Sequence, residues 1–171
     1  MFIIIGITKD ELGGSEYYEY IHGLIGGKCP TVDMASSKKI QDAVLELIKQ
    51  DVVKIAHDCS KGGLAVGISK LCILNEIGCI VSVEKIPAKK LRLDELLFSE
   101  THSRFLLVIS NKDEKKVMSF LKQKGITHAS VGSFSGKNMV FKEKSKIVTS
   151  VRVDKAQEKW LNSLEALVTH G

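Results

Sequence analysis

The sequence predicts an α+β domain in which a mixed β-sheet is covered by helices. Two patterns predict this class. Apolar runs rich in β-branched residues alternate with segments of helical periodicity, and three strand-like runs then follow one another near the end of the chain. A third observation concerns organisation. The 171 residues contain neither a linker nor a low-complexity segment, so we expect one domain spanning residues 1–171.

The first part of the chain predicts one strand and two helices. Phe2–Ile5 is a continuous run of large apolar residues, which is typical of a strand. A polar loop with two glycines follows, and Tyr17–Leu24 fits one short helical segment. Lys38–Gln50 carries apolar residues at helical spacing, and Ser36 and Ser37 are suitable caps for its amino-terminal end.

The middle of the chain predicts three strands and two helical segments. Val52–Ala56 and Cys79–Val83 are short strands, separated by a helix from about Lys61 to Glu76. Lys90–Leu97 contains four leucines and fits a short helix or a turn. Phe105–Ile109 is the most apolar strand of the chain, so we expect it to lie centrally in the sheet.

The last part predicts a helix, three strands and a second helix. The first helix follows Asp113 and is closed by a glycine. The strands are Ala129–Phe134, Met139–Lys142 and Ile147–Val151, and the intervening tetrapeptides SGKN and KEKS are predicted to be hairpin turns. The last helix is expected over Asp154–Val168, with an apolar stripe.

Charge and hydropathy together argue against two classes of partner, nucleic acids and membranes. The net charge is +5 and the isoelectric point about 9.0, but the basic residues are mostly scattered lysines without interleaved aromatic residues. This pattern indicates a solvated surface rather than a nucleic-acid interface, and it also suits an anionic small molecule. No apolar run approaches the length of a transmembrane helix, so no membrane partner is expected.

The cysteines indicate a reduced protein. Cys29, Cys59, Cys72 and Cys79 show no C-x-x-C spacing, so neither a zinc site nor a disulfide framework is predicted. We therefore expect an intracellular, cytoplasmic protein. Cys59 lies close to His57, but no separate base is identifiable and a nucleophilic cysteine is not favoured.

The segment His57–Leu64 has the pattern of a strand, a tight turn and a helix amino terminus. Such a turn directs backbone N–H groups and the positive end of a helix dipole at one point, where an anion can bind. Ser60, Gly62 and Gly63 are therefore candidate phosphate-binding residues, and Asp58 is a candidate magnesium ligand. The alternative is purely structural, with Asp58 or Ser60 capping the helix.

Two further loops carry more polar residues than packing requires. One contains Gly14 and Ser15, which are candidate nucleotide- or phosphate-binding residues. The other precedes the apolar strand. In it, Glu100 is a candidate ligand for a metal or a ribose hydroxyl, and the candidates for binding phosphate oxygens are Ser99, Thr101, Ser103 and Arg104. The structural alternative for this loop is a local salt bridge between Glu100 and Arg104.

Three blocks in this order, TKDELGGSEYYEYIHG, AHDCSKGGLAVGISKL and LFSETHSRFLLVIS, resemble the phosphoribosylformylglycinamidine synthase subunit II family. The resemblance covers nearly the whole chain and concerns the second carboxy-terminal-type domain of that subunit. It implies the fold of the aminoimidazole ribonucleotide synthetase carboxy-terminal domain. The wider superfamily includes aminoimidazole ribonucleotide synthetase, selenophosphate synthetase and thiamine monophosphate kinase.

The resemblance implies a reaction in purine biosynthesis. The family converts formylglycinamide ribonucleotide, ATP and glutamine-derived ammonia into formylglycinamidine ribonucleotide, ADP and phosphate. ATP activates an amide oxygen, ammonia displaces the resulting phosphate, and Mg²⁺ neutralises the transferred phosphoryl group. An ATP-dependent carbon–nitrogen ligase is therefore implied for the whole subunit, with ATP or ADP and Mg²⁺ as cofactors.

The resemblance also implies partners. The family's subunit has four domains, so this chain is expected to be one domain of a longer polypeptide. The implied partners are the remaining domains, a glutaminase subunit and a small accessory subunit. Most ATP contacts and the catalytic histidine lie in the other domains of the family, so the chain alone is expected to be inactive. The alternatives are a free-standing nucleotide-binding module and the equivalent domain of aminoimidazole ribonucleotide synthetase.

The family's residue roles carry over only as counterparts. In the first repeat the residue that corresponds to Asp58 binds magnesium, and those corresponding to Ser99, Glu100 and Thr101 contact substrate. The family has one catalytic cleft and one auxiliary nucleotide cleft. This chain resembles the second repeat, so Asp58 and these three residues are implied to be pseudo-symmetric counterparts of the first-repeat residues. Lys61 departs from the family, which usually has an acidic residue there; this change suits an anion and puts a second metal ligand in doubt.

Overall fold

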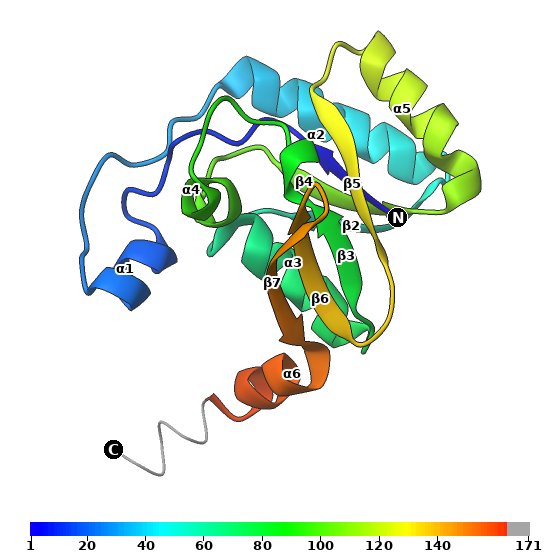
Figure 1. Cartoon of the computed structure of the whole chain (residues 1–171). Helices are drawn as coiled ribbons and strands as arrows, with labels where there is room; N and C mark the ends of the chain where they lie inside the picture. The colour runs from blue at the N-terminus through cyan, green and yellow to red at the C-terminus, as the bar shows by residue number, and fades with distance from the viewer. Residues whose placement is uncertain (164–171) are drawn as a thin grey trace.

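The computed structural model describes residues 1–163 and shows a seven-stranded mixed sheet with helices packed against it (Figure 1). The strand order is β2-β4-β1-β5-β3-β6-β7. The strands are β1 (Phe2–Ile5), β2 (Val53–Asp58), β3 (Cys79–Ser82), β4 (Phe105–Ile109), β5 (His128–Phe134), β6 (Asn138–Glu143) and β7 (Lys146–Arg152). The helices are α1 (Glu16–His22), α2 (Met34–Lys49), α3 (Gly63–Leu74), α4 (Leu93–Phe98), α5 (Glu114–Gln123) and α6 (Val153–Leu161). The predicted α+β class is confirmed.

Strand β1 is buried on both faces, which explains its unbroken apolar sequence. Phe2 and Ile4 pack in the core beneath α3, α4 and α6. Ile3 and Ile5 point to the opposite face and pack in the core beneath α2 and α5. Successive side chains of a strand alternate between faces, so a strand covered on both sides carries no polar positions. The same alternation holds for Leu106 and Leu107 in β4.

The sheet differs from the prediction in two places. Phe105–Ile109 is not central, because β4 lies second from one edge, between β2 and β1. The tetrapeptide SGKN is not a hairpin turn, because β3 lies between β5 and β6 and runs parallel to β6. The tetrapeptide KEKS does join two paired antiparallel strands, β6 and β7, as predicted.

Two element boundaries, the end of β2 and the start of α2, differ from those that the sequence pattern predicted. Strand β2 continues through Asp58, which pairs with Phe105 of β4. Helix α2 begins at Met34 because the Asp33 carboxylate accepts a hydrogen bond from the Ser36 backbone N–H at 3.0 Å. Ser36 and Ser37 therefore lie inside the helix instead of capping it. An ionised carboxylate is as effective a cap as a hydroxyl, so either residue type fitted the pattern.

The carboxy-terminal helix is described only in part. Helix α6 spans Val153–Leu161, and the remainder of the predicted helix, residues 164–168, lies outside the described part of the chain. Among the residues described, no helix has the length and apolarity needed to cross a membrane.

Candidate functional site

The three polar loops meet at the carboxylate of Glu100. Its Oε1 atom accepts hydrogen bonds from the backbone N–H of Gly62 at 2.8 Å and from that of Glu16 at 2.9 Å. The Glu100 N–H donates to the carbonyl oxygen of Glu11 at 3.1 Å. Residues of the loop before α1, of the turn before α3 and of the loop before β4 are thus joined through one side chain.

The turn before α3 depends on two glycines in left-handed conformations. Gly62 has a φ of 75° and Gly63 a φ of 62°. A Cβ atom on Gly63 would lie 2.6 Å from the carbonyl oxygen of Ser99, so this position also permits the close approach of the loop before β4. Gly62 caps α3 without a side-chain hydrogen bond, so the alternative in which Asp58 or Ser60 caps this helix is wrong.

Arg104 is buried, with 1% of its surface exposed, and its guanidinium group bonds inside the protein. It donates to the hydroxyl of Thr8 at 3.0 Å, to the carbonyl oxygen of Thr101 at 3.0 Å and to that of Ser99. The predicted alternative, a salt bridge with Glu100, is wrong. The ion pairs formed by the described residues do not include one between Arg104 and Glu100, and each side chain bonds to other partners. Arg104 fixes the loop that carries Glu100.

Three other predicted residues are also buried and bonded within the protein. Ser99 accepts a hydrogen bond from the Glu11 N–H at 3.3 Å, and Thr101 accepts one from the Lys9 N–H at 3.1 Å. Ser15 caps α1, because its hydroxyl accepts from the Tyr18 N–H at 3.3 Å. Each hydroxyl therefore positions backbone in the structure. Direct contact of these residues with a phosphate stays a prediction.

An open cleft of about 640 Å³ lies where these loops face α2. Of the predicted residues, Asp58, Ser60, Glu100, Ser103 and Arg104 line it. Gly14, Ser15, Gly62, Gly63, Ser99 and Thr101 do not line it. The far wall, which sequence reasoning missed, comes from α2 and includes Ser37, Lys38, Gln41 and Asp42.

The charges in the cleft are unevenly paired. The Lys38 ammonium lies 2.7 Å from the Asp42 carboxylate, and the Lys61 ammonium lies 2.5 Å from the Glu16 carboxylate. Asp58 is exposed and takes part in none of the ion pairs formed by the described residues. Because Asp58 has no cationic partner, it is available to a ligand that enters the cleft.

The donor set suits a cation that keeps most of its water. Among residues 1–163 no group of three or more His, Cys, Asp or Glu side chains is placed to hold a metal ion. Of the described carboxylates that line the cleft, Asp42 is paired with Lys38 and Glu100 is hydrogen-bonded to the backbone, whereas Asp58 has no cationic partner. The hydroxyl of Ser60 belongs to the same lining. Mg²⁺ commonly binds through one or two carboxylates, water and phosphate oxygens, so these residues fit a magnesium–nucleotide complex better than a protein-only metal site.

The thiol of Cys59 is not a nucleophile in this structure. It is 6% exposed, and burial raises the pKa of the Cys59 thiol to about 11. The thiolate is the reactive form, so at neutral pH this side chain is unreactive.

Alkylation of the folded protein is therefore expected to be selective. Iodoacetamide at pH 7.5 should modify Cys29, the one exposed cysteine, and leave Cys59, Cys72 and Cys79 unmodified until denaturant is added. Intact-mass spectrometry should show one adduct in the native protein and four after unfolding. Rapid native labelling of Cys59 would contradict its burial.

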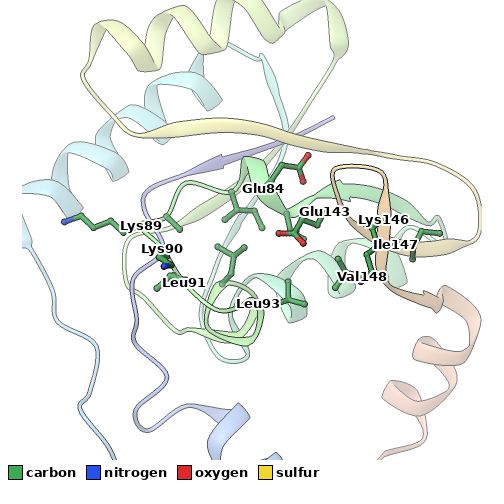
Figure 2. Close-up of a pocket in the computed structure, with 13 residues that line it drawn as sticks. Glu84, Lys89, Lys90, Leu91, Leu93, Glu143, Lys146, Ile147 and Val148 are labelled. Carbon is green, nitrogen blue, oxygen red and sulfur yellow. The ribbon is translucent and has the colours of Figure 1, made fainter.

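A second open cleft, of about 510 Å³, lies elsewhere on the sheet (Figure 2). It is formed by the segment between β3 and α4 and by the β6–β7 hairpin, and apolar residues such as Leu91 and Val148 lie beside charged ones such as Glu84 and Glu143. None of the residues predicted to bind phosphate or metal lines it. The convergent loops, not this cleft, carry the predicted site.

Comparison with known proteins places the chain in a family. Residues 3–142 match the family described as AIR synthase related protein, C-terminal domain. The phosphoribosylformylglycinamidine synthase subunit PurL of Methanocaldococcus jannaschii is 37% identical over 168 residues, which are 98% of this chain and 22% of that relative. The chain thus spans about a fifth of the length of the curated relatives it matches.

Solved structures agree on the fold. T. maritima PurL complexed with FGAR superposes with a TM-score of 0.80 at 20% identity, over 91% of this chain and 27% of that one. T. maritima PurL complexed with ATP gives a TM-score of 0.75 at 19% identity, over 91% and 25%. The family match covers most of the sequence, and the fold agrees with it. The chain therefore belongs to the family of AIR synthase related carboxy-terminal domains.

Proposed function

We propose that this chain is the carboxy-terminal-type domain of a phosphoribosylformylglycinamidine synthase subunit and that it forms one wall of a nucleotide–phosphate cleft. The observation that carries the proposal is the meeting of three polar loops beside the unpaired carboxylate of Asp58. The names of the relatives support the reaction. The T. maritima PurL complexes with ATP, ADP and FGAR support an adenine nucleotide and formylglycinamide ribonucleotide as ligands.

Each residue of the site has a part in this proposal. Asp58 would hold Mg²⁺, which would supply positive charge to a bound nucleotide, and Ser60, Lys61 and Ser103 would contact phosphate oxygens at the cleft surface. Gly62 and Gly63 shape the turn before α3. Buried residues hold the loops in place: Gly14, Ser15, Ser99, Thr101 and Arg104. No residue of this chain is assigned a catalytic role, and the chain alone is inactive.

The reaction belongs to the whole subunit in this proposal. ATP phosphorylates the amide oxygen of formylglycinamide ribonucleotide, and ammonia derived from glutamine displaces the phosphate to give formylglycinamidine ribonucleotide. Mg²⁺ supplies charge neutralisation at the phosphoryl group when it is bound. This chain contributes binding and orientation through the carboxylate of Asp58 and the polar loops of its cleft.

We propose partners from the exposed apolar residues of α1 and of the segment between α1 and α2. No residue of α1 is buried, and the segment from α1 to α2 leaves Tyr20 87%, Ile25 79% and Met34 76% exposed. Figure 1 shows α1 lying away from the sheet. Apolar surface of this extent is normally covered by another surface. We assign it to the remaining domains of the same subunit, which works with a glutaminase subunit and a small accessory subunit.

The unpaired cysteines suit the cytoplasm.

The proposal is tested by reconstitution. The remaining domains of the synthetase subunit are produced as a separate polypeptide and mixed with this chain, ammonia, Mg²⁺-ATP and formylglycinamide ribonucleotide. Product is expected only when both polypeptides are present. If the two do not associate and the chain alone binds Mg²⁺-nucleotide, the free-standing binding module is the correct alternative.

Removing the charge of Asp58 is expected to weaken Mg²⁺-ADP binding by at least about tenfold, because the cation loses its charged protein ligand. Asp58→Asn keeps the size of the side chain at the end of β2 and should leave the fold intact. Isothermal titration calorimetry gives the affinities. The matched control is Asp51→Asn, an exposed aspartate ahead of β2 and outside the cleft, which should bind as the wild type does. Equal affinities for all three proteins would remove Asp58 from the site.

A further inference from the structure

The anion position of the turn before α3 is occupied by a side chain of the protein itself. The carboxylate of Glu100 accepts the backbone N–H groups of Gly62 and Glu16, at 2.8 and 2.9 Å, through the same oxygen atom. The sequence pattern predicts that the Gly62 N–H donates a hydrogen bond to a phosphate. A charge-assisted hydrogen bond to a carboxylate satisfies it as fully as a phosphate oxygen would.

The position of Glu100 is held by the loop beneath it. The flanking residues Ser99 and Thr101 are buried, and Arg104 binds the carbonyl oxygens of both. Because this loop is anchored, the carboxylate is a tethered competitor with a high effective concentration at the turn. A free phosphate must displace it to reach the Gly62 N–H.

The surrounding charges add to this exclusion. Lys38 is engaged by Asp42 and Lys61 by Glu16, so the lysines that line the cleft are both paired. Asp58 stands without a cationic partner among the described residues. Arg104 also lines the cleft, but its guanidinium group is buried and already donates to acceptors within the protein. An anion that enters without a cation therefore meets chiefly the negative charges of Asp58 and Glu100.

We propose that Glu100 is a specificity-determining residue of the cleft, whose carboxylate fills the anion position of the Gly62 turn and makes the cleft reject phosphate groups that carry no divalent cation. The inference rests on the proposed function, because it concerns the same cleft. It adds to that function a specific prediction. Phosphate binds through a cation held at Asp58, and it does not bind to the Gly62 N–H, because the Glu100 carboxylate occupies that position.

The test compares metal-free binding in three proteins. Inorganic phosphate and ADP are titrated in the presence of EDTA into the wild type, Glu100→Gln and Glu19→Gln. Glu100→Gln keeps the shape and an acceptor oxygen but loses the charge, so metal-free phosphate should bind at least about tenfold more tightly than to the wild type. Glu19→Gln removes a charge from the exposed side of α1 and should leave the affinity unchanged. Thermal unfolding establishes that each variant is folded.

The outcomes separate this inference from the proposed function. Unchanged or weaker metal-free binding by folded Glu100→Gln overturns the inference, and so does an equal gain in Glu19→Gln. Failure of the wild type to bind Mg²⁺-ADP, both alone and when mixed with the remaining domains, overturns the proposed function instead. A gain in metal-free phosphate binding by Glu100→Gln would still support the inference in that case. Glu100→Ala, which empties the turn, is expected to exceed the gain of Glu100→Gln if it folds.

Discussion

Replacing Arg104 with alanine is expected to lower the free energy of unfolding by about 3 kcal/mol or more. The guanidinium group is buried and donates to the Thr8 hydroxyl and to the carbonyl oxygens of Ser99 and Thr101. Truncation leaves these acceptors without a donor and opens a cavity, and both effects are destabilising. The loop that presents Glu100 loses its anchor at the same time.

Urea denaturation followed by circular dichroism measures this loss. The control is Arg152→Ala, since Arg152 is exposed and forms only a surface ion pair with Asp154 at 2.6 Å. Surface pairs contribute little, so the midpoint of this variant should stay close to that of the wild type. Similar midpoints for Arg104→Ala and Arg152→Ala would show that the buried network does not stabilise the fold.

Replacing Gly63 with alanine is expected to be more destabilising than the same change at Gly136. The two glycines have nearly equal left-handed φ angles, 62° and 64°, so the backbone cost of a side chain is matched at about 1 kcal/mol. A Cβ atom on Gly63 would lie 2.6 Å from the Ser99 carbonyl oxygen, whereas one on Gly136 would meet nothing within 4 Å. The clash is expected to add about 2 kcal/mol.

Thermal and urea unfolding of the two variants isolate this contact, because the conformational term cancels between them. The loop before β4 should also shift in Gly63→Ala, which weakens the bond from the Gly62 N–H to Glu100. Equal destabilisation by the two substitutions would mean that the turn and the loop are not held together as the structure shows.

Sequence patterns predicted individual elements well where burial leaves a clear apolar pattern. Helix α2 was recognisable because its buried residues recur at helical spacing, and strand β1 because it is a short, unbroken apolar run. The strand order was not predictable in this way. The insertion of β3 between β5 and β6 depends on contacts between segments far apart in the chain, and SGKN looks like a hairpin turn although its flanking strands are not paired.

The candidate site shows the same division. Its loops were recognised by their glycines and polar residues and by the family resemblance, and they do converge. The partner of the Gly62 N–H was not recognisable, because Glu100 is distant in sequence and a carboxylate beside an arginine suggests a local salt bridge. Arg104 was expected to contact phosphate, and its burial followed only from the packing of the loop. The wall supplied by Lys38 and Asp42 carries no sequence signal, since an exposed lysine–aspartate pair is common on helices.

The central claim is that nucleotide phosphate binds where the three loops meet, and amide chemical shifts measure this most directly. The ¹⁵N-labelled chain is titrated with Mg²⁺-ADP and followed by two-dimensional NMR. We predict shifts at Asp58, Ser60, Lys61 and Ser103, and none at the cleft beside the β6–β7 hairpin (Figure 2). Shifts confined to Glu84, Leu91 and Val148, or no shifts at saturating nucleotide, would contradict the account.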